Sequence, residues 1–201
     1  VTETSSYHFE WANDPKLKEM FWEGMTSLDF EKRLTGAQFM TEKAAGSDVG
    51  EATLTAVQDG DAWRLYGEKW FCSHADADVA LLLARPAGAP AGTKGLGLFA
   101  MPRRLEDGSR NSYRIVRLKK KLGTRSMASG EIIFDGAKAY AVGDVKDGIK
   151  QMLRQVNLSR LSHGVRAAGM MRRCLNEALA VARFRRQFRE PVINKPLMQG
   201  Q

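Results

Sequence analysis

The spacing of hydrophobic and polar residues changes twice along the 201-residue chain. From about Thr35 to Tyr140, apolar residues alternate with polar ones and turn residues are frequent, which predicts a mostly antiparallel sheet. On both sides of this stretch the apolar residues recur at helical spacing. We therefore expect an α+β chain with three parts: helical pieces over residues 1–34, a β-domain over 35–145 and a helical domain over 146–201.

The alternating stretch divides into short candidate strands that are separated by turn-forming residues. Asp59-Gly60-Asp61 is a compact hairpin connection between two of them. Seven or eight short strands in about a hundred residues favour a small sandwich or barrel. The candidate strands are Ala37–Glu42, Ala52–Gln58, Ala62–Gly67, Lys69–Ser73, Val79–Arg85, Leu96–Met101, Tyr113–Leu118 and Gly130–Tyr140.

The residues before the sheet predict a loop that is followed by short helical pieces. Asp14 is placed to cap a helix that has Pro15 at its first position. One short amphipathic segment cannot bury itself, so we expect it to pack on the β-domain. Its apolar residues are Leu17, Met20, Phe21 and Met25.

After Gly148 the helical spacing predicts one long amphipathic helix, and Pro191 marks a break before a new segment, Ile193–Gln201. The chain starts without Met and stops without a helix-ending signal, so we expect it to be a piece of a longer protein. The apolar stripe of the long helix is formed by Leu158, Leu161, Val165, Ala168, Met171, Leu175, Leu179 and Ala182.

Composition excludes several classes of protein. With 43% hydrophobic and 27% charged residues, the chain has enough apolar material for a core, which excludes disordered and collagen-like chains. No apolar run approaches the roughly 18 residues that cross a bilayer. Cys72 and Cys174 are too few and too far apart for a disulfide framework or a zinc site, which favours a reducing, cytoplasmic compartment.

Two segments carry candidate chemistry. Between Gln38 and Asp48 a strand runs into small residues and hydroxyls, a composition that suits a bound pyrophosphate or the polar edge of a heterocycle. In the second segment, the adjacent Trp70 and Phe71 are expected on opposite faces of a strand, one in the core and one available for stacking, with Ser73 on the same face as Phe71. An ordinary strand-to-turn junction and plain core packing are the structural alternatives.

The spacing of these segments is specific. The pattern Met-Thr-Glu-x-x-x-Gly-Ser-Asp (residues 40–48) is followed, after about twenty residues of hairpin, by Gly-x-Lys-Trp-Phe-x-Ser (residues 67–73). This combination resembles the middle β-domain of the acyl-CoA dehydrogenase family. The resemblance continues to Arg185-Arg186-Gln187-Phe188, and it is greatest to the alkylation-response, AidB-like branch, in which Lys43 stands where most family members have Pro.

The resemblance implies a bound FAD. Gln38 would line the flavin, with the Met40 backbone and the Thr41 hydroxyl near its pyrimidine edge, and Ser47 near the pyrophosphate or an acyl-CoA. A second group would complete the site: Phe71 against the isoalloxazine, Ser73 near N5 and O4, and Cys72 between them.

The resemblance also implies a contribution from a second subunit. Arg185 and Gln187 match an element that reaches the FAD of a neighbouring subunit in family dimers or tetramers. Arg189 stands where the family usually has Gly after Phe188, so we expect a change in the geometry of that contact.

The family's reaction removes the α-hydrogen of an acyl-CoA as a proton to a Glu base, while the β-hydrogen leaves as a hydride to flavin N5. In most members the Glu would lie beyond Gln201. In isovaleryl-type members it lies at the start of the long helix, a position that Ser159 occupies here, and Ser cannot act as the base. The resemblance also leaves room for an electron-transfer partner.

The formal net charge of +8 is confined to the C-terminal quarter, where residues 150–201 hold eleven basic and two acidic residues. Three interpretations stay open: a solvated helix face, arginines that serve FAD phosphates across a subunit interface, and a DNA-binding surface. Two functions follow from the sequence: a flavin-dependent acyl-CoA dehydrogenase, and an AidB-like flavoprotein that binds DNA in the alkylation response.

Overall fold

The computed structural model describes residues 2–11 and 14–200, so Val1 and Gln201, the outer ends of the first and last predicted domains, lie outside the described residues. The chain forms two compact units, Val1–Asn157 and Leu158–Gln201. The strands are β1 (Gly36–Phe39), β2 (Thr55–Asp59), β3 (Ala62–Ser73), β4 (Val79–Pro86), β5 (Gly97–Pro102), β6 (Tyr113–Leu118), β7 (Ser129–Ala141), β8 (Arg186–Gln187) and β9 (Glu190–Pro191). The α-helices are α1 (Thr2–Trp11), α2 (Pro15–Leu17), α3 (Glu23–Thr26), α4 (Gly148–Phe184) and α5 (Pro196–Gln199), with a π-helical stretch over Lys18–Trp22.

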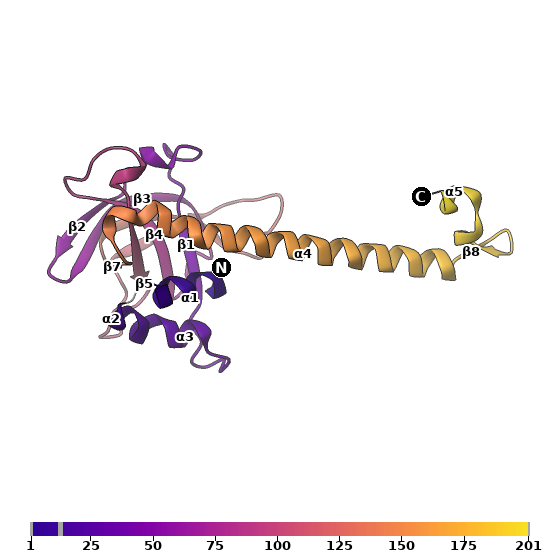
Figure 1. Cartoon of the computed structure of the whole chain (residues 1–201), viewed down its shortest axis with the longest axis horizontal. Coiled ribbons are helices and arrows are strands. Elements are labelled where there is room, and N and C mark those ends of the chain that lie inside the picture. Colours follow the sequence, from indigo (N-terminus) through magenta and orange to yellow (C-terminus); the bar gives the residue numbers. More distant parts are fainter. Residues whose placement is uncertain (1, 12–13, 201) are drawn as a thin grey trace. The chain divides into compact units, whose positions relative to one another are not determined.

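Five strands of the first unit close into a barrel. The order β4-β2-β3-β7-β5 returns to β4 through the β4–β5 pairing, while β1 adds beside β4 and β6 beside β7 (Figure 1). The expected α+β fold and mainly antiparallel sheet are therefore confirmed. Two pairings, β1–β4 and β2–β4, are parallel, which strand alternation alone does not reveal.

The central strand β4 is buried on both faces, because apolar residues fill every position from Val79 to Ala84. Leu82 joins the cluster inside the barrel, which also contains Phe39, Leu65 and Phe99. Leu81 and Leu83 join a second cluster on the outside. This second cluster includes Phe9, Leu17, Phe21, Met25 and, at the start of α4, Met152.

The N-terminal helices cover this outer face, as expected for an amphipathic segment that cannot bury itself. Asp14 caps α2 by accepting hydrogen bonds from the amides of Lys16 and Leu17, and Pro15 occupies the first helical position, which confirms the predicted helix start. The loop expected before it is wrong, since residues 2–11 form α1. Phe9 of that helix is buried, with its ring 5.2 Å from that of Phe21, a long-range contact that the local pattern does not contain.

The two candidate strands Ala62–Gly67 and Lys69–Ser73 form one strand, β3, which is interrupted by irregularities and not by a turn. The preceding hairpin is confirmed: Asp59 pairs with Ala62 across a two-residue loop, and Gly60 has a φ of 63°. Positive φ is the backbone conformation that such a loop requires and that glycine adopts without strain.

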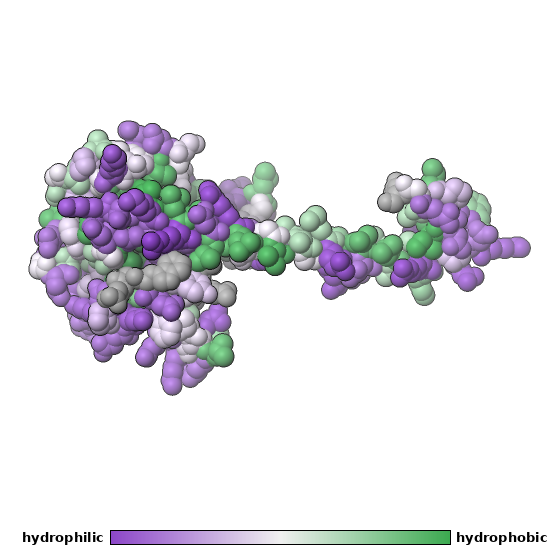
Figure 2. Space-filling view, in the orientation of Figure 1, coloured by the Kyte–Doolittle hydropathy of each residue, from purple (hydrophilic) through white to green (hydrophobic). Residues whose placement is uncertain are grey.

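The predicted long helix is confirmed as α4. Within the second unit most of its apolar stripe is exposed, with Leu161 at 68% and Met171 at 66% (Figure 2). No helix among residues 2–11 and 14–200 is long and apolar enough to span a membrane.

Candidate functional site

The structure joins the two predicted flavin segments. After β1 ends at Phe39, the chain runs beside β3, where the Trp70 amide donates a 2.8 Å hydrogen bond to the Thr41 carbonyl. Lys69 Nζ donates to the Met40 carbonyl at 3.2 Å. Both segments belong to the first unit, so their contact is built into one compact body.

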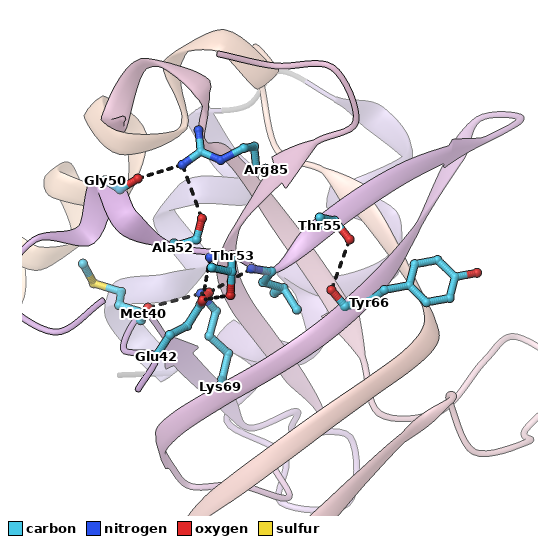
Figure 3. Close-up of polar contacts among 10 residues, drawn as sticks. Met40, Glu42, Gly50, Ala52, Thr53, Thr55, Tyr66, Lys69 and Arg85 are labelled. Atoms are coloured by element: carbon cyan, nitrogen blue, oxygen red, sulfur yellow. Dashed lines mark hydrogen bonds and ion pairs between the residues drawn. The ribbon is translucent and has the colours of Figure 1, made fainter. Parts of the chain in front are cut away.

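A buried ion pair fixes this junction (Figure 3). Lys69 Nζ lies 2.7 Å from Glu42 Oε1, and both side chains are almost fully buried. The same carboxylate accepts hydrogen bonds from the amide and hydroxyl of Thr53 and from the Leu54 amide. A buried charge is tolerated when it is paired and hydrogen-bonded in this way.

The pKa values follow from these contacts. Burial alone would raise the pKa of Glu42, but the Lys69 ammonium and the hydrogen bonds from Lys69 and Thr53 hold it below its ordinary value. Burial lowers the pKa of Lys69, and the charge of Glu42 opposes that effect. Because four donors converge on the carboxylate, we assign the pair as ammonium and carboxylate.

The expectation that either Trp70 or Phe71 enters the core is wrong, since Trp70 is half-buried and Phe71 is exposed. In the β3–β7 ladder Lys69 pairs with Ile132 and Cys72 with Gly130, so two aromatic residues stand opposite the single Glu131. This β-bulge interrupts the alternation of the strand. Lys69 and Cys72 take the buried positions instead, and Phe71 is left 44% exposed.

Cys72 lies in the barrel core, and burial raises the pKa of its thiol to about 12. Its side chain is therefore part of the core packing. Because this side chain is enclosed in the core, the predicted contact between Cys72 and a cofactor is limited to the Cys72 backbone.

The remaining predicted residues of the first unit are half-buried or exposed. Among the residues that the structure describes, Gln38 Nε2 donates to the thioether sulfurs of Met40, at 3.3 Å, and Met152, at 2.7 Å. Sulfur is a weak acceptor, so this amide can bind a better one. Ser47 is exposed, and a Cβ at the neighbouring Gly46 would meet nothing within 4 Å.

These groups fit a flavin. The site offers an exposed aromatic ring at Phe71, a hydroxyl at Ser73, an amide donor at Gln38, and open space beside Gly46 for a bulky anion. Among residues 2–11 and 14–200 no group of three or more acidic, His or Cys side chains is placed to hold a metal ion.

Arg185 and Gln187 lie in the second unit and are exposed. Gln187 belongs to the β8–β9 hairpin, whose two-residue loop is Phe188-Arg189. Both loop residues have positive φ, 51° and 68°. The replacement of a family Gly by Arg189 therefore falls at a left-handed position, where a side chain is strained.

Sequence reasoning missed several polar contacts around the aromatic pair. The run Lys119-Lys120-Lys121 follows β6, and its first and last lysines are half-buried. Lys119 Nζ lies 2.7 Å from Glu131 Oε1 and 3.0 Å from the centre of the Trp70 ring. Lys121 Nζ donates to the Met127 carbonyl and to Ser129 Oγ. A run of three lysines contains no signal for which of them the tertiary structure buries.

Comparison with known proteins agrees with this geometry. Residues 37–137 match the family model described as "Acyl-CoA dehydrogenase, middle domain", and residues 146–201 match the one described as "Acyl-CoA dehydrogenase, C-terminal domain". The two matches together cover most of the chain.

Individual relatives are similar over most of this chain. Acyl-CoA dehydrogenase family member 11 of Caenorhabditis elegans is 43% identical over 77% of this chain and 26% of its own length. AidB of Escherichia coli strain K12 is 41% identical over 80% of this chain and 29% of its own. The crystal structure of Caenorhabditis elegans ACDH-11 in complex with C11-CoA superposes with a TM-score of 0.91 at 36% identity, covering 99% of this chain and 35% of that one.

The chain thus spans about a quarter to a third of the length of these relatives. Members of the matched family are FAD-dependent flavoproteins. The barrel and its exposed Phe71 ring are consistent with the family matches. The chain therefore belongs to the acyl-CoA dehydrogenase family.

Proposed function

We propose that this chain supplies the flavin-binding face of an enzyme that performs α,β-dehydrogenation of an acyl-CoA thioester. The observation that carries the proposal is the junction of the two flavin segments, which places the exposed Phe71 ring and the Ser73 hydroxyl on the strand that is bonded to Thr41. Phe71 stacks on the ring system, Ser73 and Gln38 bind its polar edge, and Ser47 binds the pyrophosphate or the acyl-CoA.

When bound, FAD accepts at N5 the hydride that leaves the substrate β-carbon. The α-proton needs a base. Ser159, at the position of the Glu of isovaleryl-type members, lies within α4 and carries only a hydroxyl. The Glu42 carboxylate is paired with Lys69. The proposal therefore assigns proton abstraction to a Glu outside residues 1–201.

A cavity in the first unit suits the acyl-CoA. It has a volume of about 530 Å³, and its lining combines Pro90 and Ile149 with the ammonium groups of Lys94, Lys146 and Lys150. Apolar walls suit a pantetheine chain, and ammonium groups suit phosphates. Lys150 is partly neutralised by Asp147 at 2.6 Å, which leaves Lys94 and Lys146 as the main phosphate-binding groups.

Arg85 positions the loop that forms one wall of this cavity. Its guanidinium donates to the carbonyls of Pro90 and Gly92 in that loop. It also donates to the carbonyls of Gly50 and Ala52 across from it (Figure 3). A planar group with five donors can satisfy several carbonyls at once, so Arg85 fixes the loop that leads into the 3-10 helix Thr93–Gly95.

The flavin face is tested by Phe71→Ala in the intact protein. Loss of aromatic stacking, worth about 0.5–1.5 kcal/mol, should raise the Kd of FAD by a factor of roughly 2–13, measured by flavin fluorescence titration. Tyr66→Ala is the matched control, because Tyr66 is equally exposed, at 43%, on the same strand outside the flavin segments. Equal affinities for the two variants would exclude Phe71 from the site.

The substrate cavity is tested by replacing Lys94 and Lys146 with Met. Each exposed ion pair is worth about 0.5–1 kcal/mol, so the double variant should bind an acyl-CoA roughly 5- to 30-fold more weakly at low salt. Bleaching of the flavin absorbance by an acyl-CoA panel with an electron acceptor reports turnover. Lys32→Met, an exposed lysine outside the cavity, should leave both readouts unchanged.

The proposal extends to partners. The exposed apolar stripe of α4 favours burial by further helices or by a sister subunit in a homodimer or homotetramer. An electron-transfer partner would reoxidise the flavin, and the two free cysteines suit the cytoplasm.

The comparisons do not favour the alternative DNA-binding function. Salt-dependent binding of duplex DNA by the intact protein would support the DNA-binding function again.

A further inference from the structure

A short chain of hydrogen bonds ends at Ser73. Lys121 Nζ donates to Ser129 Oγ at 3.0 Å, and Ser129 Oγ lies 3.2 Å from Ser73 Oγ. The strands supply this geometry, because Ser73 and Ser129 are paired directly across the β3–β7 ladder. Ser129 is buried, whereas Ser73 and Lys121 are half-buried.

Lys121 is held firmly at the start of this chain. Its ammonium also donates to the Met127 carbonyl at 2.8 Å, and its own carbonyl accepts from Arg125 Nε at 2.8 Å. The side chain therefore ties both ends of the loop between β6 and β7. Its neighbour Lys120 is exposed.

The chemistry of the three groups fixes the direction of the protons. An ammonium group only donates, so Ser129 Oγ accepts from Lys121. The hydroxyl hydrogen of the buried Ser129 must then be donated onward, because an unsatisfied buried donor costs about 1–3 kcal/mol. Among the described residues, Ser73 Oγ is its other polar contact. Ser73 thus accepts from Ser129, and its own hydrogen is free to donate away from the protein.

We infer that Lys121, acting through Ser129, is a positioning residue that orients the Ser73 hydroxyl as a hydrogen-bond donor toward the flavin. The inference rests on the proposed function, which places Ser73 at the N5 and O4 edge. Consecutive hydrogen bonds that begin at a charged donor polarise one another, so the bond from Ser73 is strengthened. A donor to O4 stabilises the electron-rich reduced ring more than the oxidised one, so it raises the midpoint potential of the flavin.

The first experiment measures the midpoint potential of FAD bound to the intact protein. Lys121→Met and Ser129→Ala should each shift the potential to a more negative value. Lys120→Met removes the same charge one residue away and should leave the potential unchanged. Ser129→Thr keeps both a donor and an acceptor and should restore the wild-type potential, which separates the relay from a packing defect at Ser129.

A double variant separates the relay from the bare charge of Lys121. In the Ser129→Ala background the relay is already broken, so the added Lys121→Met change should shift the potential much less than it does alone. A shift of undiminished size would mean that Lys121 acts by Coulomb attraction, and it would overturn the inference. Equal potentials for wild type and Lys121→Met would overturn it as well.

A second experiment needs no flavin. In the flavin-free intact protein, Lys121 should be acetylated more slowly than Lys120, as measured by peptide mass spectrometry, and Ser129→Ala should speed the acetylation of Lys121 alone. Equal rates for the two lysines in the wild type would overturn the relay. A wild-type protein that shows slow Lys121 acetylation but takes up no FAD would overturn the proposed function instead.

Discussion

The buried pair of Lys69 and Glu42 is the residue-scale feature on which the flavin junction depends. Lys69 connects Glu42 to the Met40 carbonyl, so it fastens the segment after β1 to β3. In Lys69→Met the carboxylate is left buried without its counter-charge. We expect the free energy of unfolding of the intact protein to fall by about 3–5 kcal/mol, measured by urea denaturation.

An exposed ion pair nearby provides the control. Lys43 lies 3.2 Å from Glu68 with both side chains roughly half exposed, and Lys43→Met should change the stability by less than about 1 kcal/mol. If the two variants lost equal stability, the burial of the Lys69–Glu42 pair would have no energetic significance.

The same pair predicts a pH dependence. The folded-state pKa of Glu42 lies below its ordinary value of 4.5, so the contribution of the carboxylate is complete above that pH and is lost as the pH falls through the folded-state pKa. One carboxylate changes the free energy of unfolding by at most about 1.4 kcal/mol per pH unit. Urea denaturation between pH 3 and 7 should show a smaller loss of stability in acid for Glu42→Gln than for wild type, and parallel curves would contradict the assignment.

Among the elements, the β8–β9 hairpin stores backbone strain in its loop. Phe188 and Arg189 both adopt positive φ, which costs a non-glycine residue about 1–2 kcal/mol. Arg189→Gly removes this strain, but glycine has a higher conformational entropy in the unfolded chain, which offsets part of the effect. The hairpin should be stabilised by about 0.5–1 kcal/mol.

The measurement is amide hydrogen exchange at Val192, whose N–H donates to the Arg185 carbonyl at 2.8 Å. The Arg189→Gly change should slow this exchange by a factor of roughly 2–5. Arg186→Gly serves as the control, because its strand position has no positive φ and gains nothing from glycine. Faster exchange in Arg189→Gly would mean that the arginine side chain stabilises the hairpin.

The helix α4 presents an apolar stripe that this chain leaves exposed beyond residue 157. If the stripe is covered in the intact protein, Leu161→Glu places a charge in an apolar contact and should lower the free energy of unfolding by about 2 kcal/mol or more. Arg166→Glu, off the stripe, should have little effect. Equal thermal midpoints for wild type and Leu161→Glu would show that Leu161 faces solvent in the assembly.

For the whole molecule, a bound flavin should stabilise the folded state by mass action. At a free FAD concentration of 100 times Kd the gain is about 2.7 kcal/mol, which should be visible as a rise in the thermal midpoint of the apoprotein. Phe71→Ala should need more FAD for the same rise, and Tyr66→Ala should not. A thermal midpoint that is independent of FAD would contradict flavin binding.

The sequence by itself determined the α+β class and the order of the main elements, because the signals for these are local patterns. The continuous apolar run of β4, the Asp59–Asp61 hairpin and the helical stripe after Gly148 each appear within a stretch of neighbouring residues. The motifs also marked the two segments that we propose to bind the flavin.

Only the tertiary structure decided the contacts that span long sequence separations. The β3 bulge moved Trp70 out of the core and put Lys69 there, where Glu42, 27 residues away, compensates its charge. Likewise, Ser129 meets Ser73, 56 residues away, only across the β3–β7 ladder, and Lys121 joins this pair through Ser129. The physical reason is that the spacing of hydrophobic residues indicates only which face of a regular strand each residue occupies. Which charges are buried, and which hydroxyls must donate, depends on the partners that folding brings to that face.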